Sequence, residues 1–233
     1  LVSSSVQKAT ASLFLFEPRL PLRVKGKREL LTVFTLAGLR RQRAIRLEEP
    51  SYLLPMIGRQ AELSLISDKL RLALQKNGQI VGITAEAGMG KSRLVAEVIR
   101  VARGLGFSGY GGVCESSRTK TPYLVWKGIW QAIFSLDTAA ELQEQQRQLE
   151  TMMRVHAPQR LDALPVLGSL LDIPIDENDF TRNLSPLERR NILNVVIEDC
   201  LRSAAVETPL LLVLEDIHWI DSLSLELLDV LAT

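Results

Sequence analysis

The feature that most constrains this chain is an apolar, β-branched run that leads into a short glycine-bearing loop and then a helical pattern. The segment runs from Ile80 to Leu94, and its loop ends in Gly90-Lys91-Ser92. This order of strand, loop and helix suits a triphosphate, because loop N–H groups form an anion nest beside the positive end of the helix dipole. The sequence therefore predicts a phosphate-binding loop here.

The loop residues have distinct expected roles. Lys91 is expected to reach the β- and γ-phosphates, and the hydroxyl of Ser92 is expected to ligate Mg²⁺. The residues of the loop and first helical turn that we expect to surround the bound nucleotide are Ala85, Glu86, Ala87, Gly88, Met89, Gly90, Lys91, Ser92 and Arg93.

The loop departs from the pattern G-x-x-x-x-G-K-[ST] at its first position, where Ala85 replaces glycine. If the backbone of Ala85 has to adopt a positive φ, its Cβ introduces strain that glycine would avoid. The alternative interpretation is a glycine-rich turn between a strand and a helix that binds no ligand. The position of Gly90-Lys91-Ser92 at the strand-to-helix junction favours the phosphate-binding interpretation.

A second chemical site follows the apolar run from Pro209 to Leu214. Such a continuous run predicts a strand buried on both faces, as in a parallel sheet. Glu215 and Asp216 at its carboxyl end lie where open α/β sheets bind ligands. We expect Glu215 to help hold Mg²⁺, mostly through water, and Asp216 to orient or deprotonate an attacking water. The alternative is a pair of acids that only marks the end of a strand.

Composition narrows the class of protein. The chain has 233 residues, 46% of them hydrophobic and 24% charged, with a formal net charge of +1. These values are typical of a globular protein and favour neither a nucleic-acid-binding tract nor an acidic tail. Cys114 and Cys200 are far apart in apolar patterns, which predicts buried thiols in a reducing, cytoplasmic compartment. No signal peptide and no apolar run of about 20 residues is present.

The remaining pattern predicts an order of strands and helices. Strand-like runs are expected at residues 11–16, 20–25, 30–36 and 107–114. A first helix is expected from about 60 to 76, with Asn77-Gly78 as its C-cap, and a second from the loop to near Gly104. A third is expected to begin at Thr121, and a fourth to run from a capping box at Thr138 to His156. After an irregular stretch at 157–184, one helix is expected to begin at Ser185 and another to cover 223–231. The aromatic residues after Thr121 are more typical of a core than of a base-stacking platform.

Two segments resemble a known family. Gly58-Arg59-Gln60-Ala61-Glu62-Leu63 is similar to a segment that opens AAA-like and signalling (STAND) ATPase domains. The segment from Glu215 to Asp221 resembles the Glu-Asp-Leu-His-Trp-Ala-Asp of STAND-type ATPases found behind cyclase domains and in large LuxR-like regulators. The resemblance covers roughly residues 52–233, and it identifies the loop and the acidic strand with the Walker A and Walker B motifs. It implies that Gly58 and Arg59 touch the adenine.

A weaker resemblance covers about the first 40 residues. The segment from Arg23 to Phe34 resembles the paired strands that close a class III nucleotide cyclase catalytic domain. The metal-binding aspartates of such a domain would lie upstream of Leu1, so we expect no cyclase activity from this piece. The basic run at residues 40–43 is expected to be a solvated linker.

Together these patterns predict a three-layer α/β P-loop NTPase with a parallel sheet, preceded by a small β-rich remnant. The expected division is residues 1–46 for the remnant, 47–55 for a linker and 56–233 for the ATPase domain. In the family that the chain resembles, the strand after Walker B lies between the Walker A and Walker B strands. Because this chain begins without Met and stops inside a helical pattern, we expect a fragment whose sheet is incomplete at the C-terminus.

The expected function is ATP binding with slow Mg²⁺-dependent hydrolysis, acting as a switch in a multidomain signalling protein. Lys91, Glu215 and Asp216 are the catalytic candidates, and Ser92, Glu215 and Asp216 the metal ligands. Expected partners are ATP or ADP, an upstream cyclase-like domain and downstream helical or repeat domains, with no membrane and no indicated nucleic acid. The alternative is a nucleotide-gated assembly scaffold without significant turnover. A DNA-binding regulator would need support from further sequence.

Overall fold

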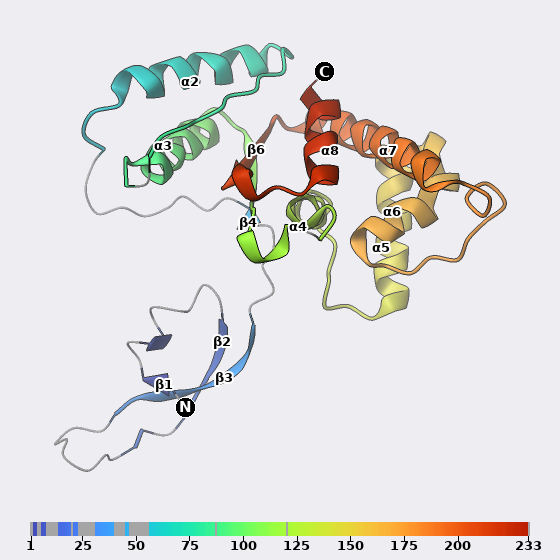
Figure 1. The fold of residues 1–233 in the computed structure, drawn as a ribbon, viewed down its shortest axis with the longest axis horizontal. Coiled ribbons are helices and arrows are strands. Elements are labelled where there is room, and N and C mark those ends of the chain that lie inside the picture. Colours follow the sequence, from blue (N-terminus) through green and yellow to red (C-terminus); the bar gives the residue numbers. More distant parts are fainter. Residues whose placement is uncertain are drawn as a thin grey trace. The chain divides into compact units, whose positions relative to one another are not determined.

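The computed structural model divides into two compact units, Leu1–Arg43 and Ala44–Thr233 (Figure 1). The structure describes residues 2–3, 6–7, 14–19, 21–22, 31–39, 45–46, 56–86, 88–119 and 121–232. The sequence places the first boundary after residue 46. The structure places it after Arg43, because Ile45–Arg46 forms a strand, β4, that pairs with a strand of the second unit.

The first unit contains a three-stranded antiparallel sheet. Its strands are β1 (Val2–Ser3), β2 (Phe14–Pro18) and β3 (Val33–Leu39), in the order β1-β3-β2. An isolated antiparallel bridge joins Leu22 to Leu31, between the two runs that the sequence predicts as a hairpin. The turn at residues 25–29, the basic run at 40–43 and the linker at 47–55 lie outside the described residues.

The second unit is built on a mixed sheet of three short strands. β5 (Ser108–Val113) is central, with β4 antiparallel on one side and β6 (Leu210–Glu215) parallel on the other. The parallel register runs from Ser108 opposite Leu210 to Val113 opposite Glu215. A parallel pair needs a crossover connection, and here that connection is a layer of helices.

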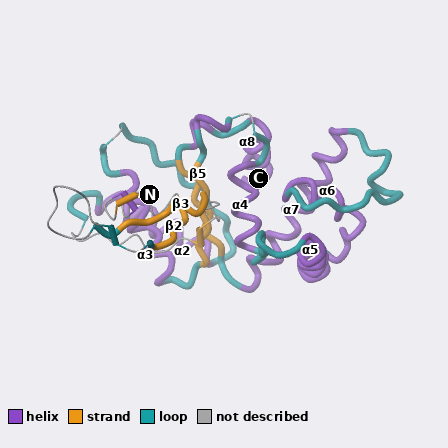
Figure 2. Tube along the Cα trace, turned by 90° about the horizontal axis from the view of Figure 1, so that it is seen from below, coloured by secondary structure: helices purple, strands orange, loops and turns teal. Residues whose placement is uncertain are grey.

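Helices cover both faces of this sheet. On one face, α2 (Gln60–Leu74) and α3 (Lys91–Gly104) share an apolar cluster with Phe107 and with Leu211 of β6. The other layer consists of α4 (Leu124–Ile133), α5 (Leu142–His156), α6 (Leu164–Leu171), α7 (Pro186–Glu207) and α8 (Ser222–Ala232). Its core reaches Leu210, Leu212 and Leu214 of β6, so successive side chains of this strand face opposite layers. Figure 2 shows the helices of this layer extending away from the strands.

The aromatic side chains of α4 form the centre of the second layer. The ring centroids of Trp126 and Trp130 are 5.9 Å apart, and those of Trp130 and Phe134 are 6.1 Å apart. Both tryptophans are 1% exposed. The prediction that these aromatic residues are core is therefore confirmed.

Two sequence predictions about strands are wrong. Residues 79–86 form no strand in the described structure, and Ile80 is 65% exposed. The strand β6 packs against apolar clusters on both faces of the sheet, but it is half-buried along its length rather than fully buried. Both differences have one cause: within the described residues, β6 has a ladder partner only in β5, and no strand lies between it and residues 79–86.

Several helix ends also differ from prediction. The left-handed residue that ends α2 is Lys76, at φ 62°, rather than Asn77 or Gly78. No side-chain cap forms at Thr138, and α5 begins at Leu142 with Glu141 as its N-cap. The stretch 157–184 is not wholly irregular, because it contains a 3₁₀ helix at Pro158–Ala163 and then α6. Local patterns predict that a helix exists more reliably than they predict where it ends.

The start of α7 agrees with the prediction. The hydroxyl of Ser185 accepts a hydrogen bond from the Glu188 amide at 3.3 Å, and the Glu188 carboxylate accepts one from the Ser185 amide at 2.8 Å. This is the expected capping box. With 22 residues, α7 is the longest helix in the described part of the chain, and neither it nor any other described helix is long and apolar enough to cross a membrane.

Gly168 allows the chain after α6 to fold back onto the helix. A Cβ at Gly168 would lie 2.6 Å from the Ile173 carbonyl oxygen, whereas a Cβ at Gly104, in the last turn of α3, would meet nothing within 4 Å. We expect Gly168→Ala to lower the free energy of unfolding by about 1–3 kcal/mol, less the gain in helix propensity. Gly104→Ala should be neutral or stabilising. Equal stability of the two variants in urea unfolding would contradict this close approach.

Candidate functional site

The loop before α3 has the backbone geometry of an anion site. Gly88 and Gly90 have φ values of 79° and 80°, in the left-handed region that favours glycine. Gly90 is the N-cap of α3, no side chain caps the helix there, and its first turn contains no acidic residue. The first N–H groups of a helix have no partner within the helix. At this end they are therefore available to an anion.

Ala85 does not disturb this loop. It is not among the residues with positive φ, so the replacement of glycine at this position introduces no backbone strain. The left-handed conformation falls at the two glycines that remain. Ala87, which we expect to be part of the nucleotide site, lies outside the described residues.

Lys91 folds back over the loop that precedes it. Its Nζ donates to the carbonyl oxygens of Ala85, at 2.6 Å, and Glu86, at 3.1 Å. The ammonium group is thus held above the loop, where phosphate oxygens could replace these carbonyls as acceptors. The neighbouring Ser92 is exposed, while Arg93 forms an ion pair with Glu97 along α3 at 3.3 Å.

Arg59 connects the start of α2 to the same loop. One guanidinium nitrogen donates to the Met89 carbonyl oxygen at 3.0 Å, and another contacts the Glu62 carboxylate at 3.1 Å. Gly58 and Arg59, at φ 76° and 63°, are both left-handed. The structure therefore brings the sequence-predicted Arg59 to the loop before α3, with Gly58 next to it in the chain.

The two carboxylates lie at the carboxyl end of β6, as the sequence predicts. Glu215 is half-buried, and its carbonyl oxygen accepts a hydrogen bond from the Cys114 amide at 3.0 Å. Asp216 is exposed and left-handed, at φ 53°, and turns the chain into a 3₁₀ helix over Ile217–Trp219. The His218 ring packs against Trp219 at a centroid distance of 4.9 Å, as expected for a loop residue.

The pKa of the Cys114 thiol reflects burial and the negative charge at this end of the sheet. Burial, together with the negative charges of Asp221 and Asp216, raises the pKa of the Cys114 thiol to about 11. The thiol therefore stays protonated at neutral pH. The sequence predicts a buried thiol, which is confirmed, but it does not reveal that the charges of two carboxylates act on this thiol, because that depends on the pairing of β5 with β6.

Asp221 holds the loop after β6 in place. Its Oδ1 accepts hydrogen bonds from the Ser224 amide at 2.9 Å and from the Tyr123 amide at 3.3 Å. The first bond caps α8. The second connects α8 to the start of α4, where Tyr123 is left-handed at φ 56°. Sequence reasoning missed this link because the two residues are 98 positions apart.

The loop and the carboxylates are supported by one shared core. Leu94 of α3 and Leu211 of β6 belong to the same apolar cluster. In the described structure no hydrogen bond or ion pair joins Lys91 or Ser92 to Glu215 or Asp216, and no three His, Cys, Asp or Glu side chains gather as a metal cluster. One hydroxyl and two carboxylates fit Mg²⁺, which keeps several waters and also binds substrate phosphates.

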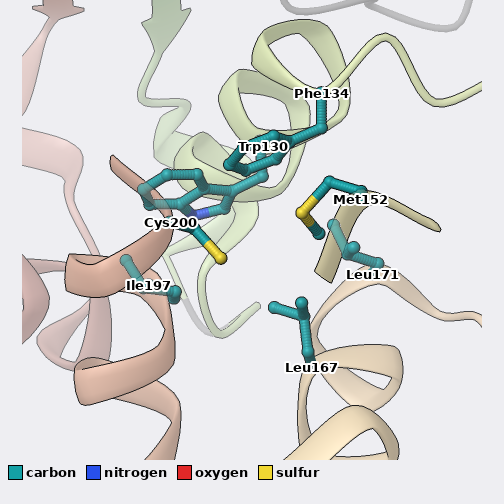
Figure 3. A pocket seen from close by; sticks show the side chains of 7 residues that line it. All are labelled: Trp130, Phe134, Met152, Leu167, Leu171, Ile197 and Cys200. Atoms are coloured by element: carbon teal, nitrogen blue, oxygen red, sulfur yellow. The ribbon is translucent and has the colours of Figure 1, made fainter. Parts of the chain in front are cut away.

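An apolar cavity between the helices offers no comparable chemistry. It is lined by side chains of α4, α5, α6 and α7, including Trp130, Met152 and Cys200 (Figure 3). Its volume is about 10 Å³, close to the minimum for one water. The indole N–H of Trp130 has no acceptor among the described residues. With a single polar group, this cavity is a packing gap rather than a nucleotide site.

Comparison with known proteins identifies the family. A family model for the AAA ATPase domain matches residues 55–233, which is more than half of the chain. The chain therefore belongs to the AAA ATPase domain family and has its P-loop α/β fold. Nucleotide binding, usually with Mg²⁺, is the property of that family. No curated protein and no solved structure matches the chain.

The Asp221 carboxylate gives a direct test of the geometry around the acidic strand. Asp221→Ala removes the acceptor of two backbone amides, so we expect the free energy of unfolding to fall by about 1–2 kcal/mol. Asp221→Asn retains an oxygen at Oδ1 and should lose less. Urea unfolding of both variants checks this, and an equal loss in the two would show that the negative charge matters rather than the hydrogen bonds.

Proposed function

We propose that this chain binds ATP and hydrolyses it slowly with Mg²⁺, and that the nucleotide state acts as a switch in a larger signalling protein. The observation that supports the proposal best is the amino end of α3. That end lacks a side-chain cap and follows two left-handed glycines, and the ammonium group of its first residue, Lys91, folds back over the preceding loop. A helix end of this kind is complementary to a phosphate group.

Each candidate residue has a role in this proposal. The amides of Gly88 to Ser92 bind the β- and γ-phosphates, and Lys91 exchanges its loop carbonyls for phosphate oxygens. Ser92 and Glu215 hold Mg²⁺, which when bound neutralises charge on the β- and γ-phosphates. The exposed Asp216 orients or deprotonates the attacking water.

The proposal of slow turnover rests on the two arginines in the first turn of α7. Arg189 is paired with Glu177 at 2.9 Å and also donates to the Thr181 carbonyl, and Arg190 is paired with Glu226 at 2.9 Å. Because both are paired within the helical layer, we propose neither of them as an arginine finger. An arginine finger accelerates phosphoryl transfer by about 10³–10⁵, so we expect slow hydrolysis.

The regulatory context rests on resemblance. The Glu215–Asp221 segment resembles STAND-type ATPases, and the residues near Arg23–Phe34 resemble the end of a class III cyclase domain. We therefore propose an upstream cyclase-like domain and downstream helical or repeat domains as partners in the same protein, in the cytoplasm. ATP and ADP are the proposed ligands.

A nucleotide-gated scaffold remains the second candidate. It is favoured by the bonds of Lys91 in the described structure, where this residue donates to the Ala85 and Glu86 carbonyls and makes no hydrogen bond or ion pair with Glu215 or Asp216. A phosphate loop that is complete without the carboxylates can bind nucleotide without turnover. The two candidates make the same prediction for Lys91 and different predictions for Asp216.

Replacement of Lys91 tests binding. We expect Lys91→Ala to raise the Kd for Mg·ATP by about 10- to 100-fold, the loss of one charged hydrogen-bond donor. Arg103→Ala removes an exposed cation at the other end of the same helix and should leave the Kd unchanged. Isothermal titration calorimetry on the whole protein measures both. Unaltered binding by Lys91→Ala would exclude the loop as the phosphate site.

Replacement of Asp216 separates the switch ATPase from the scaffold. In an ATPase, Asp216→Asn should abolish phosphate release while Mg·ATP still binds, because the amide cannot accept a proton from water. Asp229→Asn, an exposed change on α8, is the matched control and should release phosphate at the wild-type rate. If the wild-type protein binds Mg·ATP but releases no phosphate, the scaffold is the correct function.

A further inference from the structure

The contact between Arg59 and Met89 links the start of α2 to the phosphate loop. The two residues are 30 positions apart, and the bond runs from the guanidinium to a backbone carbonyl at 3.0 Å. The Met89 side chain is 55% exposed, so packing of this side chain is not what holds the loop there. The contact acts on the backbone.

The position of Arg59 is itself tightly defined. Its backbone is left-handed, a conformation that costs a non-glycine residue about 1–3 kcal/mol and persists only where the surroundings impose it. Its carbonyl oxygen accepts the first helical bond of α2, from the Leu63 amide at 3.0 Å. Because Ile66 and Leu70 of α2 share a core with Leu94 of α3, the helix that begins after Arg59 packs against the helix that follows the loop.

The geometry of the peptide bond gives this contact a consequence for the ligand. In a trans peptide the C=O and N–H point in opposite directions. When Arg59 holds the carbonyl of Met89, the N–H of Gly90 in the same peptide is directed away from the guanidinium. Lys91 holds the carbonyls of Ala85 and Glu86 in the same manner. Cations thus hold three loop carbonyls, and the bond to the Met89 carbonyl orients the Gly90 amide.

We infer that Arg59 is a positioning residue for the phosphate loop rather than a residue that contacts the base. Arg59 fixes the Met89–Gly90 peptide before nucleotide binds. This inference rests on the proposed nucleotide site. It predicts that Arg59 affects affinity for the triphosphate group whether or not a nucleoside is attached. It also predicts an effect on the loop when no ligand is present.

The first measurement is amide hydrogen exchange in the ligand-free whole protein. In Arg59→Met, peptides that cover residues 85–92 should exchange several-fold faster than in the wild type. Arg71→Met is the matched control, because Arg71 lies on the same helix, forms an i,i+3 pair with Asp68 and has no contact with the loop in the described structure. Unchanged exchange in Arg59→Met would overturn the inference, since a residue that only touches ligand leaves the empty loop as it was.

The second measurement compares two ligands by calorimetry, Mg·ATP and inorganic tripolyphosphate with Mg²⁺. Arg59→Met should weaken both by the same factor, about tenfold for one charged hydrogen bond. Arg59→Lys, which keeps the cation but not the fork to Met89 and Glu62, should weaken both by less. A loss for Mg·ATP alone would assign Arg59 to the base and overturn the inference.

Two further controls separate this inference from the proposed function and from misfolding. If the wild type and Lys91→Ala bind neither ligand, the proposed function fails, and the inference fails with it. If wild type binds both ligands and Arg59→Met does so equally well, only the inference fails. A thermal melt of each variant shows whether that variant is folded. If Arg59→Met is unfolded, the binding of Arg59→Lys is compared with that of the wild type instead.

Discussion

The backbone N–H groups at the start of α3 have no partner within the helix, and the arrangement around the candidate site depends on them. No side chain caps this end, whereas Ser185 and Glu188 cap α7 reciprocally. Gly88 and Gly90 before the helix are both left-handed, and Lys91 and Arg59 donate hydrogen bonds to carbonyl oxygens of the same loop. A helix end left open in this way is stabilised when an anion occupies it.

The rest of the second unit supports this helix end and the acidic strand from two directions. One cluster joins α2, α3 and Leu211, and the other joins β6 to the tryptophan-centred helical layer. Because alternate side chains of β6 reach both cores, Glu215 and Asp216 are positioned by packing on both faces of the sheet. Asp221 adds a polar connection between α4 and α8 just after the carboxylates.

Much of this could be predicted from local sequence, and the failures have physical causes. Helix α3, strands β5 and β6, the Ser185 capping box and the buried aromatic residues follow from short patterns of apolar and capping residues. The strand predicted before the glycine loop does not form in the described structure, and β6 is less buried than predicted, because strand formation and burial depend on a neighbouring strand. The end of α2 and the start of α5 were wrong because weak local signals compete there.

The sequence by itself determined the chemistry of this protein: a strand-like run, a glycine loop with Lys91 and Ser92, and an apolar strand ending in Glu215 and Asp216. These are local in the chain, so spacing and residue type are enough to reveal them. Only the tertiary structure decided that Arg59 holds the Met89 carbonyl, and that burial and the charges of Asp221 and Asp216 raise the pKa of Cys114. These pairs of residues are 30 to 107 positions apart, and they interact only because α2 packs on α3 and β5 pairs with β6.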